Sequence, residues 1–165
     1  MAVYPVRLFG DPVLREKSHQ VDDLNKEIRA LAVSMAETMH DASGVGLAAP
    51  QIGVLKQVIV IDMNEEGFVV YVNPVIKEMS KETETDEEGC LCLPDIRVPV
   101  KRPKRVVVEA LDLKGRKVEI EADELLARIL QHEIDHLRGH TILDRTDSEM
   151  RQKALREFME NTAGL

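Results

Sequence analysis

The chain has 165 residues, of which 44% are apolar, and a formal net charge of −8. This length favours a single domain over residues 1–165, large enough to bury a core without disulfide bonds. The acidic balance and the lack of a clustered Lys/Arg stripe argue against a nucleic-acid-binding surface, so we expect no direct DNA binding.

No segment has the pattern of a secretory signal or the roughly 18 consecutive apolar residues of a membrane span. The chain has two cysteines, Cys90 and Cys92, which are one residue apart. A disulfide bond across that spacing would be strained, and free thiols are typical of a reducing compartment. We therefore expect a cytoplasmic protein with no membrane attachment.

The N-terminal part of the sequence predicts an extended arm over residues 1–20, with a turn at residues 10–12. The apolar residues that follow have the helical period, which predicts a helix from a cap at Asp22 or Asp23 to about His40. These apolar positions are Leu24, Ile28, Leu31, Met35 and Met39. We interpret the two methionines as core residues rather than ligands.

Residues 44–51, Gly-Val-Gly-Leu-Ala-Ala-Pro-Gln, have the composition of a tight loop. Two glycines around one apolar residue let the backbone approach a neighbour closely. A phosphate-binding loop is the competing interpretation, but no Gly-Lys-Ser/Thr follows and the next residues do not signal a helix start. By itself, this loop identifies no function.

Alternating apolar residues predict strands over residues 57–63 and 68–76, joined by a turn at residues 64–67. A second hairpin is predicted from residues 105–112 and 117–121. These two pairs of strands indicate an antiparallel sheet.

Charged residues mark two further segments. Residues 82–88 include five acidic side chains, which we interpret as a solvated loop. Residues 146–149, Thr-Asp-Ser-Glu, predict a capping box that opens a last helix to about Glu160. The apolar stripe of this helix would consist of Met150, Ala154, Leu155, Phe158 and Met159.

The most informative stretch is His-Glu-Ile-Asp-His at residues 132–136, inside a helix predicted from about Asp123 to Arg138 and ended by Gly139. Histidines four apart share one helix face and can reach one metal ion, and the intervening glutamate can accept a proton from a bound water. A polar turn of a surface helix is the competing interpretation. Apolar residues fill two adjacent stripes, which favours a buried helix and a metal site within it. The stripes are Leu125, Ile129, His132 and His136, and Leu126, Leu130, Glu133 and Leu137.

A catalytic metal usually has three protein ligands and one open position, so the class of enzyme depends on the third ligand. In one class of enzyme the third ligand is a histidine six residues after the second histidine of the motif, but Ile142 occupies that position here. Another has a glutamate about twenty residues downstream, where Glu157 and Glu160 have a suitable spacing. The remaining candidate is the thiolate of Cys90.

Cys92 leaves a rival interpretation of the metal site open. If residues 90–92 are extended, both cysteines point to the same side, and both could bind in a closed Cys₂His₂ structural site. Glu133 argues against this rival, because a structural site has no reason to bury a glutamate beside the metal.

Three stretches together resemble the signature motifs of the peptide deformylase family. They are residues 44–51, Glu-Gly-Cys-Leu at 88–91 and Gln-His-Glu-Ile-Asp-His at 131–136, in matching order and spacing. The similarity covers nearly the whole chain, and its length and last helix resemble the type 1 bacterial form. The resemblance implies removal of the formyl group from the N-terminal formyl-methionine of new polypeptides, with release of formate. We expect an α+β fold with antiparallel β-sheets around a central metal-binding helix, an N-terminal helix and a C-terminal helix.

The resemblance also implies roles for individual residues. The metal ligands would be Cys90, His132 and His136, and the general acid/base would be Glu133. Oxyanion donors would be the Gln51 side-chain amide and the Leu91 backbone N–H. The methionine pocket would be lined by Val45, Gly46, Leu125 and Ile129, while Glu88 and Arg97 would orient the site and bind the substrate chain. Arg102 and Asp135 match a buried supporting ion pair.

One divalent metal ion is implied, expected to be Fe²⁺, with Zn²⁺, Ni²⁺ or Co²⁺ possible in the isolated protein. The implied partners are N-formyl-methionyl nascent peptides and, transiently, the ribosome. The main difference from the family pattern is Cys92, where serine is usual, and we expect this thiol to make the site easier to oxidise. Arg128 replaces an apolar residue of some relatives, and at the pocket mouth its charge would affect the substrate residues beyond methionine.

Overall fold

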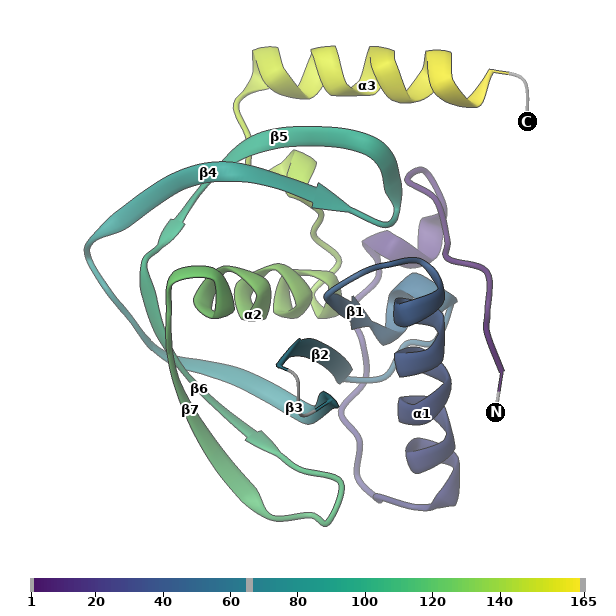
Figure 1. Cartoon of the computed structure of the whole chain (residues 1–165), viewed down its shortest axis with the longest axis vertical. Coiled ribbons are helices and arrows are strands. Elements are labelled where there is room, and N and C mark those ends of the chain that lie inside the picture. The colour runs from purple at the N-terminus through teal and green to yellow at the C-terminus, as the bar shows by residue number, and fades with distance from the viewer. Residues whose placement is uncertain (1, 65–66, 164–165) are drawn as a thin grey trace.

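A long helix, α2 (Glu124–Leu137), lies at the centre of the fold with β-strands on two sides of it (Figure 1). The structure is a computed structural model that describes residues 2–64 and 67–163. Antiparallel sheets and three α-helices confirm the predicted α+β class. None of the described helices is long and apolar enough to cross a membrane.

One side of α2 faces a five-stranded antiparallel sheet with the strand order β1-β2-β3-β6-β7. Its strands are β1 (Gly46–Ala48), β2 (Val58–Asn64), β3 (Gly67–Met79), β6 (Arg105–Leu111) and β7 (Lys117–Asp123). The two predicted hairpins are therefore confirmed. The turn predicted at residues 64–67 includes residues 65 and 66, which lie outside the described residues.

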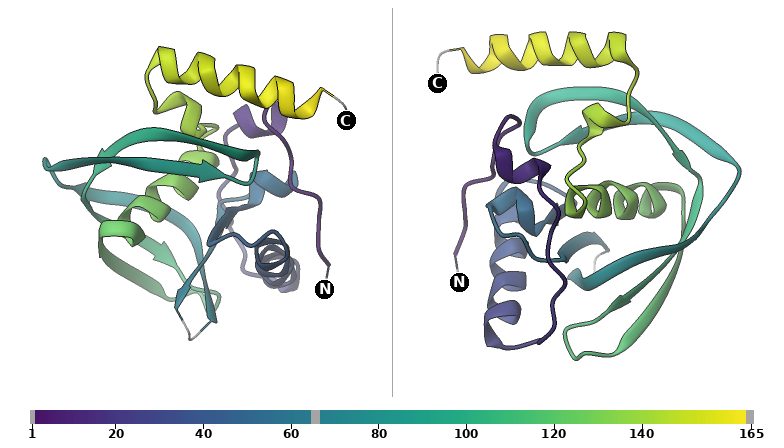
Figure 2. Two further views of the ribbon diagram at one scale, coloured as in Figure 1. Left: turned by 45° about the horizontal axis from the view of Figure 1, so that its top comes forward. Right: turned by 180° about the vertical axis from the view of Figure 1, so that it is seen from behind.

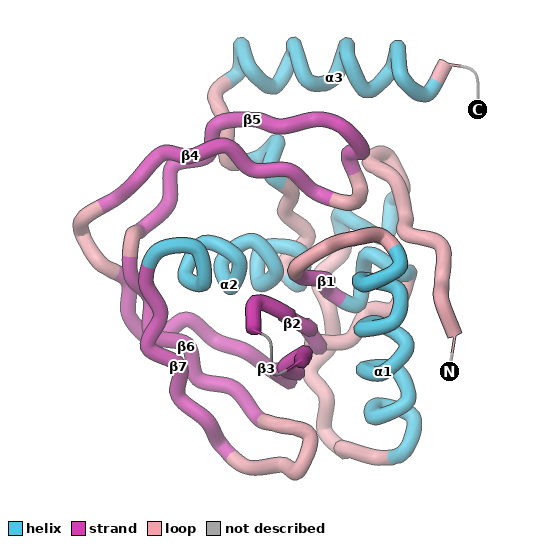
Figure 3. Tube along the Cα trace, viewed as in Figure 1, coloured by secondary structure: helices cyan, strands magenta, loops and turns pink. Residues whose placement is uncertain are grey.

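On the other side of α2 lies a two-stranded sheet of β4 (Thr83–Cys90) and β5 (Leu93–Pro103) (Figure 3). The prediction of a solvated loop over residues 82–88 is wrong, because this segment pairs in register with β5, for example Glu88 with Val98. Backbone pairing outweighs the low β propensity of acidic residues here. The other acidic side chains of β4 are exposed, whereas Glu88 is buried.

The first long helix, α1 (Lys26–Asp41), begins later than predicted. Asn25 is its N-cap, since its side chain accepts a hydrogen bond from the Ile28 N–H, so the predicted caps at Asp22 or Asp23 are wrong. The prediction that Met35 and Met39 are core residues is confirmed, because neither is accessible to solvent.

Helix α2 has the predicted extent within one residue at each end, and Gly139 follows its C-cap with a φ of +81°, the left-handed conformation expected there. The prediction that both apolar stripes are buried is wrong at its first turn, because Leu125 is 56% exposed. Leu125 lies instead at a cleft described below. Further along the helix, Ile129, Leu130 and Ile134 are buried as expected.

The last helix, α3 (Ser148–Thr162), lies outside β5, and the β4–β5 sheet separates it from α2 (Figures 1 and 2). Its cap is Asp147, which accepts from the Met150 N–H, so the predicted capping box starts one residue too early. Ala154 is buried, but Met159 is 66% exposed and does not belong to the packed stripe. Only the face toward β5 is covered.

Three short 3₁₀ helices complete the described part of the chain: η1 (Pro12–Arg15), η2 (Ala49–Ile52) and η3 (Ile142–Asp144). The second of these follows β1 directly, where no local pattern predicts a helix. It is important for the site because it carries Gln51.

Candidate active site

A cleft of about 890 Å³ lies between β1, the end of β4 and α2. Its walls include almost the whole predicted site: Val45, Gly46, Gln51, Glu88, Cys90, Leu91, Arg97, Leu125, Ile129, His132 and Glu133. The remaining predicted residue, His136, is buried next to Cys90. The fold thus brings together three sequence motifs that are far apart in the chain.

The two histidines of α2 lie one turn apart and meet Cys90 at the end of β4. The centroids of the His132 and His136 rings are 5.1 Å apart. The Cys90 Sγ lies 3.3 Å from the His136 Nε2. One thiol and two imidazoles are a donor set that suits a first-row transition metal.

Cys92 also belongs to this cluster. Its Sγ lies 3.1 Å from the Cys90 Sγ, and both cysteines are free. The donor atoms of Cys90, Cys92 and His136 lie within 4.8 Å of one another, which makes them a possible metal-binding group of the described chain. The structure therefore supports a metal site here.

Glu88 orients the ring of His132. The His132 Nδ1 lies 2.9 Å from the Glu88 Oε1, so the Nε2 of this ring stays available to a metal. Arg102 donates two hydrogen bonds to the Glu88 carboxylate, at 2.6 and 3.0 Å. Although burial acts to raise it, the hydrogen bonds from His132 and Arg102 lower the pKa of Glu88 to about 2.

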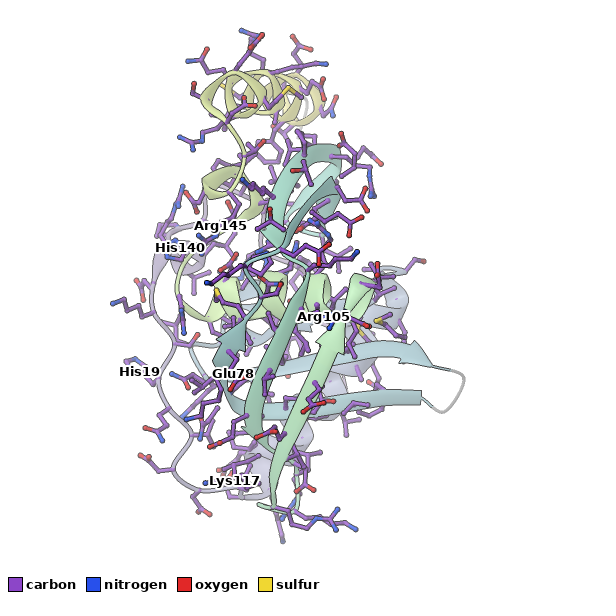
Figure 4. All side chains as sticks on the ribbon, turned by 90° about the vertical axis from the view of Figure 1, so that its left-hand side faces the viewer. His19, Glu78, Arg105, Lys117, His140 and Arg145 are labelled. Carbon is purple, nitrogen blue, oxygen red and sulfur yellow. The ribbon has the colours of Figure 1, made fainter. Side chains whose placement is uncertain are left out.

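The predicted ion pair between Arg102 and Asp135 is also present, with the Arg102 Nη1 2.9 Å from the Asp135 Oδ2. Asp135 accepts two further hydrogen bonds from Arg145, which is labelled at the side of the molecule in Figure 4. A chain of charged groups therefore leads from His132 through Glu88 and Arg102 to Asp135.

Glu133 is buried beside β1. Burial raises the pKa of Glu133 to about 7. Among the described residues, its Oε2 and the Nδ1 of His136 are buried atoms without a hydrogen-bond partner. A Cβ at Gly46 would lie 2.8 Å from the Glu133 Oε1, so only glycine fits there without displacing the carboxylate. The carboxylate is thus poised to exchange a proton near neutral pH.

The Gln51 side chain is fixed with its amide nitrogen toward Cys90. Its Oε1 accepts a hydrogen bond from the Ala48 N–H at 2.9 Å, and its Nε2 lies 3.5 Å from the Cys90 Sγ. Because the oxygen is occupied, the NH₂ group faces the cluster as a donor. Leu91, the next residue after Cys90, lines the same cleft.

The charges around Cys90 fit a bound cation. The hydrogen bond with Cys92 and burial raise the pKa of Cys90 to about 12. Burial acts to lower the pKa of His132, but hydrogen bonds with Cys90 and Glu88 raise it well above its usual range. The cluster therefore favours positive charge, and a metal cation would supply it while holding the thiolate.

Comparisons with known proteins agree with this site. A family model described as Polypeptide deformylase matches residues 3–152. A peptide deformylase from Acidothermus cellulolyticus is 49% identical over 161 residues, 97% of this chain and 88% of that protein. The chain belongs to the peptide deformylase family. It is an enzyme that removes the formyl group from the N-terminal formyl-methionine of newly made polypeptides.

Solved peptide deformylases have the same fold. The structure from Legionella pneumophila has a TM-score of 0.94 at 37% identity and covers 98% of this chain and 96% of its own. The structure from Ehrlichia chaffeensis in complex with actinonin has a TM-score of 0.93 at 36% identity and covers 98% of this chain and 99% of its own.

A third ligand from the C-terminal helix is excluded in this deformylase. Glu157 and Glu160 lie on α3, which the β4–β5 sheet separates from α2 (Figure 1). Their spacing in the sequence was suitable, but the segment between α2 and α3, which includes η3, carries the chain to the far side of that sheet.

Arg128 lines the cleft, as considered above, but its guanidinium is turned to the small sheet. It is buried, and its Nη1 donates to the Glu88 Oε2 at 2.7 Å and to the Val100 carbonyl at 2.8 Å. Its Nη2 donates to the Glu84 carbonyl at 2.8 Å. Arg128 thus ties α2 to both strands of the small sheet. Its position one helical turn before His132 was the available signal for this role.

Proposed function

We propose that deformylation takes place in this cleft with one divalent cation held by Cys90, His132 and His136. We expect the cation to be Fe²⁺, although Zn²⁺, Ni²⁺ or Co²⁺ suits the same donors. Support comes from the hydrogen bond of the His132 Nδ1 with Glu88, which leaves the Nε2 of this ring available, and from the Cys90 sulfur next to His136. When bound, the cation would polarise the formyl oxygen and make water nucleophilic at neutral pH.

The chain's own residues supply the proton transfer and the oxyanion donors. Glu133 would accept a proton from the attacking water and later deliver it to the leaving amine. The Gln51 amide and the Leu91 backbone N–H would donate to the formyl oxygen as negative charge develops on it, an effect worth about 2.7–4 kcal/mol for each donor. Formate and a free α-amino group are the products.

The apolar side of the cleft would bind the methionine side chain through Val45, Gly46, Leu125 and Ile129. The peptide would lie extended along β1, which is an edge strand of the large sheet and borders the cleft. Main-chain hydrogen bonds of this kind tolerate many sequences. Glu88 would hold His132, and the exposed Arg97 would bind the substrate chain.

The single observation that carries this proposal is the buried Glu133 carboxylate, with a pKa raised to about 7 by burial and one oxygen without a partner. The test is formate release from a formyl-Met tripeptide by protein purified without oxygen and loaded with Fe²⁺ or Ni²⁺. We expect Glu133→Gln to bind the metal and to lose at least about 10²-fold in kcat. A Glu133→Gln variant as active as the wild type would contradict the assigned role.

The closed Cys₂His₂ site is the second candidate, and the 3.1 Å separation of the two sulfurs favours it. The near-ultraviolet absorption of the Co²⁺-loaded protein distinguishes the two. If Cys92 is not a ligand, Cys92→Ser leaves the thiolate-to-cobalt band at its wild-type strength while Cys90→Ser abolishes it. A weaker band in Cys92→Ser would assign Cys92 as a ligand.

We also propose that the protein acts in the cytoplasm on chains that emerge from the ribosome, which it would meet transiently. The observation in support is the substrate itself, a formyl-methionine that is present only on new chains. Co-sedimentation with ribosomes that carry a short formylated nascent chain, compared with empty ribosomes, tests this contact. If the protein co-sedimented with neither ribosome preparation, the proposed contact would be contradicted.

A further inference from the structure

The N-terminal arm, residues 2–9, forms part of the cleft wall but has no role in the proposal above. It runs past α1 to the turn between β4 and β5 (Figures 1 and 2). The backbone N–H groups of Ala2 and Tyr4 donate to the side-chain hydroxyls of Ser34 and Thr38 on α1. The first half of the arm is thus tied to α1.

The second half of the arm is fixed next to the proposed oxyanion donors. The Arg7 N–H donates to the Gln51 carbonyl at 2.7 Å, and the Phe9 N–H donates to the Cys92 carbonyl at 2.9 Å. The ring of Phe9 also packs edge-to-face on Phe158 of α3, with centroids 6.0 Å apart. The arm is therefore held in place at the cleft before any substrate binds.

Val6 and Leu8 alternate with these anchoring residues, and both line the cleft. Leu8 is 37% exposed. Among the exposed large apolar side chains of the described chain, Leu8, Val45 and Leu125 line this cleft. Val45 and Leu125 are assigned to the methionine pocket above, which leaves Leu8 as an apolar contact for another part of the ligand.

We propose that Val6 and Leu8 form a second apolar subsite that contacts the residues following formyl-methionine and sets the enzyme's preference among them. The cleft volume of about 890 Å³ is near the upper end of the range for pockets that hold drug-sized ligands, so it has room for more than one side chain. This inference rests on the proposed function, since it takes a formylated peptide as the ligand. Apolar downstream residues are favoured because they bury the exposed part of Leu8.

The test compares kcat/KM for formyl-Met-Leu-Leu, formyl-Met-Ser-Ser and formyl-methionine amide. We expect Leu8→Ala to lower the value for the leucine peptide about three- to tenfold. The value for formyl-methionine amide, which does not reach the subsite, changes by less than about twofold. Leu8→Lys adds a charge, so it should prefer formyl-Met-Glu-Glu over formyl-Met-Lys-Lys more strongly than the wild type does.

Val3→Ala is the matched control, because Val3 is an exposed apolar residue of the same arm outside the cleft lining. It should leave all three values unchanged. Equal losses on all substrates in Leu8→Ala, or no loss on any, would overturn the subsite. If the wild type releases no formate from any peptide, the proposed function fails instead. In that case, fluorescence anisotropy gives the affinities of labelled peptides for the metal-loaded variants, and the same comparison between peptides and variants tests the subsite.

Discussion

At the scale of single residues, Gly46 shows how closely the site is packed. Its Cα faces the carboxylate of Glu133, and an added Cβ would also lie 3.1 Å from a side-chain carbon of Ile129. The glycine pair at residues 44 and 46 in the sequence indicated a close approach of the backbone to something. That the neighbour is Glu133, almost ninety positions later in the chain, follows only from the fold.

We predict that Gly46→Ala lowers kcat/KM about 10²-fold, because the methyl group displaces Glu133 from the reacting atoms. Steady-state formate release measures the effect, and thermal unfolding shows that the fold is retained. Gly89→Ala is the comparison, since a Cβ there meets its neighbours only at ordinary contact distances, the Arg97 side chain at 3.4 Å and the Ile96 carbonyl at 3.5 Å. A Gly46→Ala enzyme with wild-type kcat/KM would show that Glu133 need not hold this position.

At the scale of elements, helix α2 and the β2–β3 and β6–β7 hairpins could be predicted because their signals are local. Periodicity, a capping position and Gly139 define α2 within one residue of the expected ends. Strand β4 could not be predicted in this way, because its acidic residues have low β propensity and its stability comes from pairing with β5. The cap at Asn25 was missed because several Asx residues near it were equally suitable.

The site residues followed from the motifs and the resemblance, but the connections between them did not. Arg128 was singled out in the sequence as a possible influence on the substrate. It does line the cleft, but the structure also buries its guanidinium against β4 and β5. Which carboxylate and which carbonyls a buried arginine contacts depends on the register of two strands. That register is set by long-range pairing, so no local pattern carries it.

We predict that Arg128→Met destabilises the protein by about 3 kcal/mol. The Val100 and Glu84 carbonyls lose a hydrogen-bond donor, and the buried negative charge of Glu88 loses one of its positive partners. Because Glu88 orients His132, the substitution should also weaken the affinity for the metal about tenfold. Urea unfolding and metal titration measure the two effects. Arg105→Met is the control, since Arg105 is an exposed arginine on β6, labelled in Figure 4, and we expect almost no change from it. Equal effects in the two variants would remove Arg128 from the network.

At the scale of the whole molecule, buried charges join the small sheet to the central helix, and the exposed Arg145 extends this network to the segment after the helix. Glu88 comes from β4, Arg102 from β5, Asp135 from α2, and Arg145 from the turn before α3. Three apolar clusters stabilise the parts of the fold separately. The charged network connects the parts that carry the metal ligands, so its protonation should affect the stability of the entire domain.

We therefore predict that acid unfolds the protein through this network. The pKa of Glu88 is about 2 in the folded protein and 4.5 in its ordinary state, and hydrogen bonds with Arg145 and Arg102 outweigh burial to lower the pKa of Asp135 too. A carboxyl group whose pKa is lowered by folding stabilises the folded protein at pH values above its ordinary pKa. This stabilisation is lost as the pH falls through the pKa of the folded state. For Glu88 the loss is about 3 kcal/mol between pH 5 and pH 2.

The metal-free protein isolates this effect, because protonation of metal ligands then adds nothing through metal release. His132 does not contribute in this range, since it is protonated both folded and unfolded below pH 5. Urea unfolding should give a higher free energy at pH 5 than at pH 7, because the raised pKa of Glu133 favours the folded protein as this carboxyl takes up a proton. A clear decrease should follow between pH 5 and pH 3, where Glu88 is protonated. In Glu88→Gln the protein is less stable at pH 7 but should lose much less between pH 5 and pH 3, because the group that titrates is gone. If Glu88→Gln lost as much free energy of unfolding between pH 5 and pH 3 as the wild type does, other carboxylates would control stability in acid.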